Sequence, residues 1–354
     1  MSIIFAILLF SLLIFVHELG HFMAAKASNV QVNEFAMFMG PAIWKKQKGE
    51  TLYSIRCIPI GGFCAMEGED SDTENPRSFQ KAAWWKRLII LVAGSAMNFL
   101  AGVLIMVIVF LPMQYAVMPT IASFEEGCTL NIEGGLQVGD TFLEIDGEKI
   151  YVQSDFSTIL ALNPGDVHDL VVERNGQKVE LKNFKMEKHD FPDKDGIMSQ
   201  RFGFSFKKVY AFTLGEKLTY AWKNVLNAGR LVRLSLQMLL TGEAGVSDMS
   251  GPVGIVGQMN DMAQASPTFV AALMNMLYFG GFIAINLAIM NLLPIPALDG
   301  GRVVALLITT AIVKITGKEI NPKYEGYIHG IGMVLLLLLM AFIMFKDIFT
   351  IFKG

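Results

Sequence analysis

The sequence predicts a polytopic α-helical membrane protein with four transmembrane helices and a β-rich domain inserted between the second and third. Composition is the first observation: of 354 residues, 53% are hydrophobic and 17% charged, against about 25% charged in average soluble domains. The second is that the apolar residues gather in four blocks, and the third is a stretch of short strands and turns between two of them. A net charge of −3 indicates no nucleic-acid partner.

Each apolar block is long enough to cross a bilayer, because a hydrocarbon core of about 30 Å needs about 20 helical residues. A cleaved signal peptide would have Lys or Arg before its apolar run. No Lys or Arg precedes the first block, so we expect that block to be retained. A further apolar run, Val303–Val313, is too short to predict a fifth crossing. The four blocks are Ser2–Val16, whose helix is expected to continue to Ala25, Leu88–Leu111, Phe269–Leu293 and Tyr327–Phe345.

The distribution of Lys and Arg predicts the orientation in the membrane. Both types gather in Lys26–Arg87 and recur in Pro294–Gly326, whereas Pro112–Glu148 contains neither. Because positively charged loops stay in the cytoplasm, we expect the inserted domain outside and both termini extracytoplasmic. Lys346 and Lys353 near the C-terminus argue mildly against this orientation.

The inserted segment predicts a small β-rich domain at about Met118–Phe206. Strands are expected at Thr141–Ile145 and after it, with a turn at Asp146-Gly147 and a hairpin turn at Asn175-Gly176. The following Leu214–Leu240 has helical periodicity, and two interpretations stay open. It is either an amphipathic helix on the outer membrane surface or a helix packed on the insert.

The helix of the first apolar block carries His17-Glu18-Leu19-Gly20-His21, an H-E-x-x-H motif, near its end. On a helix, residues i and i+4 share a face, so both imidazoles can bind one Zn²⁺. Glu18 then lies beside the metal and is placed to take a proton from zinc-bound water. The alternative is a polar helix end at the membrane interface, but ionisable residues in a spanning helix are costly and indicate function.

A third metal ligand is needed, and Asp299 is the best candidate. It lies in Asn291-Leu-Leu-Pro-Ile-Pro-Ala-Leu-Asp-Gly-Gly301, directly after the third block, where prolines end the helix and glycines allow a sharp turn. Irregular backbone at membrane depth is tolerated where it lines a protein cavity. The alternative is an ordinary loop with a capping Asp.

Taken together, these motifs and their order resemble the site-2 protease family, in particular its bacterial regulator-of-sigma-E branch. The resemblance implies one Zn²⁺ per chain held by His17, His21 and Asp299, with Glu18 as general base. It implies a bacterial inner-membrane endopeptidase with its active site toward the cytoplasm. Its implied partners are the lipid bilayer, single-span membrane substrates of the anti-sigma-factor or remnant-signal-peptide type, and an upstream site-1 type protease.

Part of the insert, Gly135-Leu-Gln-Val-Gly-Asp140 with Ile145-Asp-Gly-Glu-Lys-Ile150, resembles a PDZ core. A PDZ-like domain here would act as a size filter for substrates or as a spacer. The predicted organisation is therefore two helices with the H-E-x-x-H motif and a cytoplasmic β-hairpin loop, a PDZ-like domain, a connecting helical region, and two helices with the D-G-G motif. Their expected ranges are residues 1–111, 112–213, 214–268 and 269–354.

Substrate-binding residues are expected in three places. Asn291 in the family motif is taken to contact the substrate backbone, and Asn98 either lines the cavity or bonds a neighbouring helix. The segment Gly49–Met66, with Ile55, Gly61 and Gly62, resembles the family's membrane-dipping β-hairpin, whose edge could pair with an extended substrate. A solvated cytoplasmic hairpin is the alternative.

His329, alone in the fourth block, is expected to have a structural or interfacial role, and the three cysteines are expected to be structural. Two other functions compete with a site-2 type protease. Prenyl-protein endopeptidases share membrane H-E-x-x-H motifs, but they lack a PDZ-like insert and the D-G-G element. A metal-binding scaffold or transporter would not need the general base Glu18.

Overall fold

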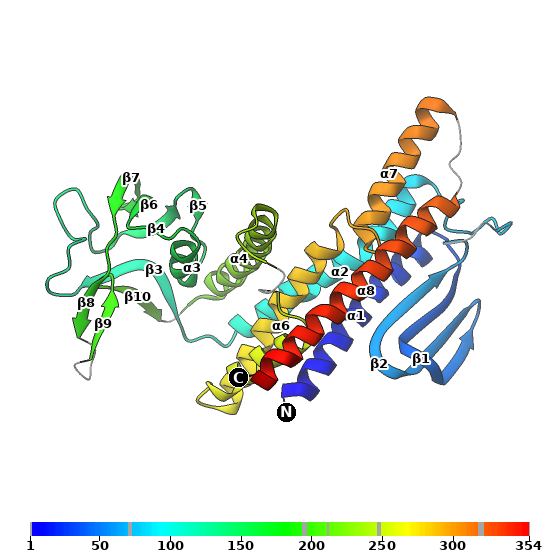
Figure 1. Ribbon diagram of the computed structural model, residues 1–354, viewed down its shortest axis with the longest axis horizontal. Coiled ribbons are helices and arrows are strands. Elements are labelled where there is room, and N and C mark those ends of the chain that lie inside the picture. The colour runs from blue at the N-terminus through cyan, green and yellow to red at the C-terminus, as the bar shows by residue number, and fades with distance from the viewer. Residues whose placement is uncertain are drawn as a thin grey trace. The chain divides into compact units, whose positions relative to one another are not determined.

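The computed structural model describes residues 2–69, 73–192, 197–210, 212–245, 249–317 and 322–353. These residues form two compact units (Figure 1). The first unit combines Met1–Met106 with Ala228–Gly354, and the second is Val107–Asn227. The predicted division into residues 1–111, 112–213, 214–268 and 269–354 remains a prediction.

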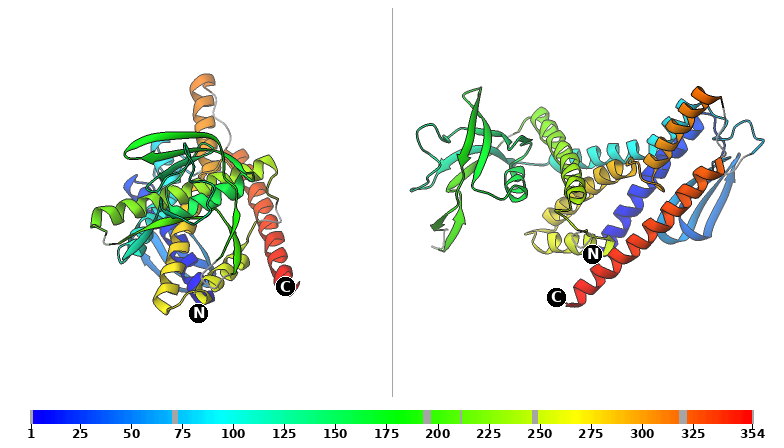
Figure 2. Two further views of the ribbon diagram at one scale, coloured as in Figure 1. Left: turned by 90° about the vertical axis from the view of Figure 1, so that its left-hand side faces the viewer. Right: turned by 45° about the horizontal axis from the view of Figure 1, so that its top comes forward.

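Four helices among the described residues are long and apolar enough to cross a membrane, as the sequence predicts. The predicted short run at residues 303–313 belongs to a separate helix, α7 (Asp299–Thr316), which is not among them. In Figures 1 and 2 the beginning of α1 and the end of α8 lie at the same end of the first unit, as an even number of crossings requires. The four helices are α1 (Ser2–Ala27), α2 (Trp84–Phe110), α6 (Phe269–Asn291) and α8 (Pro322–Lys353).

Between α1 and α2 the chain forms a curved sheet from β1 (Val32–Lys48) and β2 (Thr51–Met66). It is larger than the hairpin expected at Gly49–Met66, because β1 also takes part. Both strands bend, so that Glu34–Met37 pairs with Leu52–Ile55 on one side and with Gly62–Ala65 on the other. The sheet therefore has Gly62–Ala65 at one edge.

A charge cluster fastens this sheet to the end of α1. Glu50, in the turn between β1 and β2, accepts hydrogen bonds from Arg77 Nη1 at 2.6 Å and Lys26 Nζ at 2.6 Å. These two cations, Arg77 foremost, hold the pKa of Glu50 at about 2. Because the folded-state pKa lies below the ordinary value, this contribution to stability is present at neutral pH and is lost as the pH falls toward 2.

The second unit contains a mixed α and β domain whose sheet has the strand order β10-β3-β4-β6-β7, with β5 beside β4. Both predicted turns are confirmed, since Asp146-Gly147 and Asn175-Gly176 have positive φ at both positions, as type I′ hairpin turns require. Helix α3 (Gln153–Leu162) was not predicted, because its ten residues are too few for a clear periodic pattern. The strands are β3 (Tyr115–Phe124), β4 (Thr141–Ile145), β5 (Glu148–Lys149), β6 (Val167–Arg174), β7 (Gln177–Lys185), β8 (His189–Pro192), β9 (Met198–Arg201) and β10 (Phe204–Tyr210).

This domain has its own core around Phe142, which is fully buried and stacks on Phe204 of β10 at 5.9 Å between ring centroids. Phe156 of α3 packs on the same aromatic group, 4.9 Å from Phe142. Asp140, fully buried, accepts two hydrogen bonds from Arg174, at 2.8 and 2.7 Å. The buried charge is thereby paired in the bidentate geometry that offsets its desolvation.

Two more helices connect the units to the third crossing. Helix α4 (Leu214–Thr241) matches the helix predicted at Leu214–Leu240. Helix α5 (Pro252–Gln264) was not predicted. Its N-terminus is capped by a residue that is distant in sequence. Asp347 of α8 accepts hydrogen bonds from the backbone N–H groups of Gly251 and Gly254, at 2.8 and 2.9 Å. A carboxylate placed there satisfies the free donors of the helix start and complements its dipole.

Candidate metal centre

Three predicted ligands meet at one point of the first unit. His17 Nε2 and His21 Nε2 of α1 lie 3.1 Å apart, and Asp299 Oδ2 at the start of α7 lies 3.2 and 3.3 Å from them. Ligand atoms 2.0–2.1 Å from a tetrahedral Zn²⁺ are about 3.3–3.4 Å from one another. The triangle therefore has the size that three zinc ligands require.

The chemistry of the donor set fits a cation as well. Asp299 Oδ2 is buried, and no hydrogen bond of good geometry from the described residues reaches it. A buried carboxylate oxygen beside two imidazole nitrogens is costly unless a positive charge compensates it. Among the described residues, this is the group of His, Cys, Asp and Glu side chains that could hold a metal ion, and no cysteine takes part.

Each imidazole is oriented by its other nitrogen, as metal-binding histidines usually are. His21 Nδ1 lies 2.8 Å from the backbone oxygen of Ile90 in α2, to which it donates when Nε2 is the ligand. His17 Nδ1 lies 3.4 Å from the Asn98 amide and 3.5 Å from the Asn291 amide. The structure thus brings both predicted asparagines to His17.

Glycine residues allow α1 and α2 to approach at this site. A Cβ on Gly94 of α2 would overlap His21 Nε2 and lie 2.8 Å from His17 Cε1. A Cβ on Gly20 of α1 would lie 2.7 Å from the carbonyl carbon of Ala93 and 2.9 Å from Met97 Cγ. Small residues that let helix backbones touch are common between membrane helices. Here the close approach places the α2 backbone directly against both imidazoles.

Glu18 lies beside the edge of the sheet. A Cβ on Gly62 would meet Glu18 Cγ at 3.5 Å, so the backbone of β2 passes next to this carboxylate. Gly61 precedes the edge segment Gly62–Ala65, whose outer side pairs with no other strand in the described part of the chain. Ile55 lies instead in an inner segment, where it pairs with both Met37 and Trp44. Its side chain is 41% exposed, but its backbone is already paired.

The loop that carries Asp299 is folded tightly on itself. A Cβ on Gly300 would overlap the backbone of Leu292, and one on Gly301 would overlap the backbone oxygen of Ile295. These two positions therefore accept only glycine without a shift of the loop. Arg302, one residue further, forms an ion pair with Glu69 beyond the end of β2.

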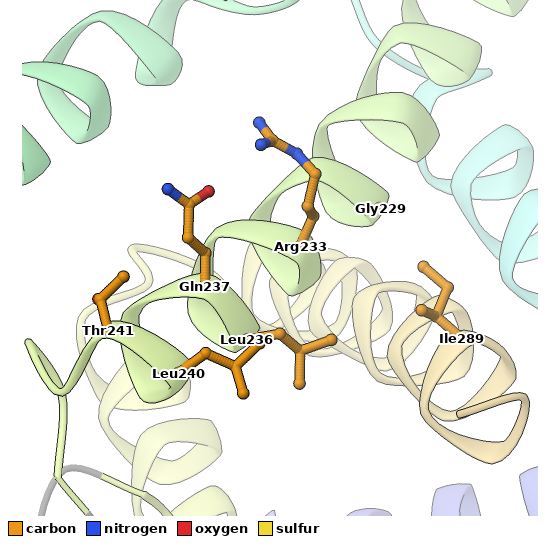
Figure 3. A pocket seen from close by; sticks show the side chains of 7 residues that line it. All are labelled: Gly229, Arg233, Leu236, Gln237, Leu240, Thr241 and Ile289. Atoms are coloured by element: carbon orange, nitrogen blue, oxygen red, sulfur yellow. The ribbon is translucent and has the colours of Figure 1, made fainter. Parts of the chain in front are cut away.

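A cavity of about 490 Å³ lies elsewhere in the first unit, between α4 and α6. Figure 3 shows Leu236 and Leu240 of α4 at this cavity, with Ile289 on the neighbouring helix. None of His17, Glu18, His21 or Asp299 lines it. The metal centre and this cavity are separate features.

A transmembrane helix with H-E-x-x-H, completed by an Asp from another helix, defines a membrane metalloprotease. The profile of peptidase family M50 matches residues 5–339, and the chain belongs to this family, the site-2 proteases. It is thus a multi-pass membrane protein and a metalloprotease, and the names of its relatives imply zinc.

Relatives match over nearly their full length. A Clostridium acetobutylicum protein with a provisional zinc metalloprotease name is 35% identical, with 98% of this chain and 97% of that protein covered. Zinc metalloprotease RasP of Geobacillus kaustophilus is 27% identical, with 98% and 97% covered. Regulator of sigma-W protease RasP of Bacillus subtilis is 26% identical, with 99% of both chains covered.

Some neighbours of the centre could not be assigned from sequence. Gly94 matters because it is the α2 residue that faces the imidazoles. The sequence places Gly94 in the segment Gly94-Ser-Ala-Met-Asn98 but does not show which residue of that segment faces them. The Ile90 carbonyl is a backbone group, so no residue type marks it. His329 lacks any local motif, although it contacts the loop before Asp299.

Proposed function

We propose that this protein is a zinc-dependent intramembrane endopeptidase that cleaves the transmembrane segments of single-span membrane proteins. The observation that carries the proposal is the triangle of His17, His21 and Asp299 with Glu18 beside it, on a helix able to span a bilayer. The three residues hold one Zn²⁺ per chain. Substrates are of the anti-sigma-factor or remnant-signal-peptide type, as the sigma-W name of the Bacillus relative supports.

Glu18 is the general base and acid of the reaction. It accepts a proton from the attacking water and passes it to the nitrogen of the leaving amine. Bound zinc supplies Lewis-acid chemistry, polarising the scissile carbonyl and acidifying water. His17, His21 and Asp299 hold the ion, and the Ile90 carbonyl keeps His21 turned toward it.

Asn98 and Asn291 orient His17. Asn98 is 2% exposed, and its Oδ1 has no hydrogen-bond partner among the described residues. The two ends of an amide have the same shape, so turning it places Oδ1 near the N–H at His17 Nδ1. That arrangement satisfies a buried oxygen and leaves His17 Nε2 free to bind the metal. Asn291 lies at the same nitrogen and is also placed to contact substrate.

The edge segment Gly62–Ala65 binds substrate as an added strand. A substrate helix hides its carbonyls in i→i+4 hydrogen bonds and must unwind before cleavage. An unpaired strand edge next to Glu18 stabilises the extended form through backbone hydrogen bonds. Ile55, whose backbone is paired on both sides, contributes its exposed side chain to the substrate-facing surface.

The metal centre faces the cytoplasm, and the PDZ-like domain and both termini lie outside, in the bacterial inner membrane. The charge distribution supports this orientation, because Lys26–Arg87 is rich in Lys and Arg. The domain excludes intact ectodomains, so that an upstream site-1 type protease must first shorten the substrate. The bilayer is a partner throughout.

The proposal is tested with purified protein in liposomes and a single-span substrate. A chelator should abolish cleavage, and added Zn²⁺ should restore it, with one zinc bound per chain in the active sample. Full cleavage in metal-free samples would contradict the proposal. So would a zinc-loaded protein that cleaves none of a panel of shortened single-span substrates, because a metal-binding scaffold behaves in that way.

Substrate helix strength should control the cleavage rate. Each Gly→Ala change near the cut stabilises the helix by about 1 kcal/mol and should slow cleavage about fivefold. The measurement is the rate for matched substrates under single-turnover conditions. The same Gly→Ala change placed a full helix length from the cut serves as control. Cleavage rates that do not depend on helix strength near the cut would contradict the proposal that the substrate helix must unwind before cleavage.

Deleting Met118–Phe206 should allow full-length substrates to be cleaved, because the size filter is gone. The deletion joins Val117 to Lys207, and in the intact sheet Val117 of β3 pairs with the next residue, Lys208 of β10. The ends to be joined are therefore close in space. The measurement is cleavage of intact and shortened forms of one substrate.

The shortened substrate is the internal control for this deletion. It should be cleaved at similar rates by the intact and the deleted protein, which shows that the metal centre survives. A deleted protein that cleaves the shortened form but still rejects the intact one would contradict the filter.

A further inference from the structure

Helix α8 contacts the loop that delivers the proposed third ligand. The backbone N–H of Ala297 donates a hydrogen bond of 3.1 Å to His329 Nδ1 on α8. Ala297 precedes Asp299 by two residues. One helical turn along α8, a Cβ on Gly332 would lie 2.9 Å from the backbone of Pro296. His329 and Gly332 share a helix face, and both touch the same short loop.

The loop needs an anchor from outside at this point. Ala297 has φ of +79°, a left-handed conformation that residues with a side chain rarely adopt. Such conformations persist where surrounding contacts enforce them. Two prolines, Pro294 and Pro296, remove backbone donors on the same side of Ala297. The Ala297 N–H therefore has its acceptor in His329 rather than in a regular helix.

The contact stands out against the rest of α8. Between the buried Gly332 and Ile343, none of the ten residues Met333–Phe342 is buried. At the other end of the helix, Asp347 holds the N-terminus of α5. Polar contacts at its two ends, together with the close approach at Gly332, thus account for much of how α8 is held.

We propose that His329 is a positioning residue for the metal centre: by accepting the Ala297 N–H, it fixes the backbone that sets Asp299 against His17 and His21. The inference rests on the proposed zinc-peptidase function. It requires the neutral tautomer with its proton on Nε2, since Nδ1 is the acceptor. Outer contacts that hold a ligand typically change metal affinity or activity by about 10–100-fold.

Two substitutions separate the effect of the hydrogen-bond acceptor at His329 from the effect of the side-chain volume. His329→Leu keeps the bulk and removes the acceptor, whereas His329→Asn places Oδ1 near the position of Nδ1. We expect His329→Leu to lose zinc to a chelator at least about tenfold faster than wild type. His329→Asn should retain zinc nearly as well as wild type. In cleavage assays, His329→Leu should lower kcat with little change in KM.

A second pair of substitutions, at two glycines on the same turn of α8, tests the loop contact by adding a methyl group. Gly332→Ala places a methyl group against Pro296 and should accelerate zinc loss. Gly330→Ala meets no atom within 4 Å and should behave as wild type. Both changes raise helix propensity equally, so a difference in zinc loss between the two variants must come from the contact with the loop.

Each result decides the inference. Wild-type zinc retention in His329→Leu overturns it, and so does equal loss in His329→Leu and His329→Asn, because then the ring and not its acceptor matters. Equal zinc retention in Gly332→Ala and Gly330→Ala also counts against the loop contact. A wild-type protein that binds zinc but cleaves nothing would contradict the proposed function. The comparison of zinc retention among the variants would still test the role of His329.

Discussion

Glu18→Gln is expected to reduce cleavage by about 10³-fold while the protein keeps its zinc. The amide has the shape of the carboxylate but cannot accept a proton from water. The three ligands are untouched, because Glu18 is not part of the triangle of His17, His21 and Asp299. The measurement combines the single-turnover cleavage rate with the zinc content of the same sample.

The matched control is Glu126→Gln, which removes the same charge from an exposed position in the inserted domain. It should leave both zinc content and cleavage rate at the wild-type level. If Glu18→Gln cleaved at the wild-type rate, another group would have to be the base. If it lost its zinc, Glu18 would be needed for the metal site and not only for proton transfer.

Gly94→Ala is expected to cause most of the bound zinc to be lost, with at least about 100-fold slower cleavage. The added methyl group would overlap His21 Nε2 and press on His17 Cε1. In a helix interior, Gly→Ala alone favours folding by about 1 kcal/mol, so any loss must come from the collision. The measurement is zinc per chain together with the thermal stability of the purified variant.

Gly102→Ala on the same helix is the control for this collision. Its methyl group would meet Ile285 Cγ1 at 2.7 Å and the backbone oxygen of Gly281 at 3.2 Å, and neither residue belongs to the metal centre. We expect a change in stability with zinc content intact. Equal zinc loss in Gly94→Ala and Gly102→Ala would mean that helix packing in general, and not contact with the imidazoles, holds the site.

The parts of the fold with strong local signals were predictable. Four apolar blocks correspond to α1, α2, α6 and α8, since the bilayer demands such blocks. Asp146-Gly147 and Asn175-Gly176 also formed the expected turns, because their left-handed conformation is encoded within two residues. The chelating face of α1 follows from helix periodicity alone.

The features that were missed depend on pairing between distant segments. The sheet of β1 and β2 has four segments because both strands bend at Phe38–Gly40 and near Gly61, where φ is positive at Phe38, Gly40 and Gly61. A sequence pattern gives no register for such a fold. Likewise, the contact of His329 with Ala297 joins residues 32 positions apart, and only the packing of α8 reveals it.

The most direct test of the metal centre is X-ray absorption at the zinc edge of the full-length Glu18→Gln protein, with the metal content measured on the same sample. We expect one zinc per chain, bound by nitrogen and oxygen atoms at about 2.0–2.1 Å and by no sulfur. His21→Ala should abolish this signal. A sulfur ligand at about 2.3 Å, which would indicate a cysteine site, would contradict a metal centre of His17, His21 and Asp299, as would an unchanged signal in His21→Ala.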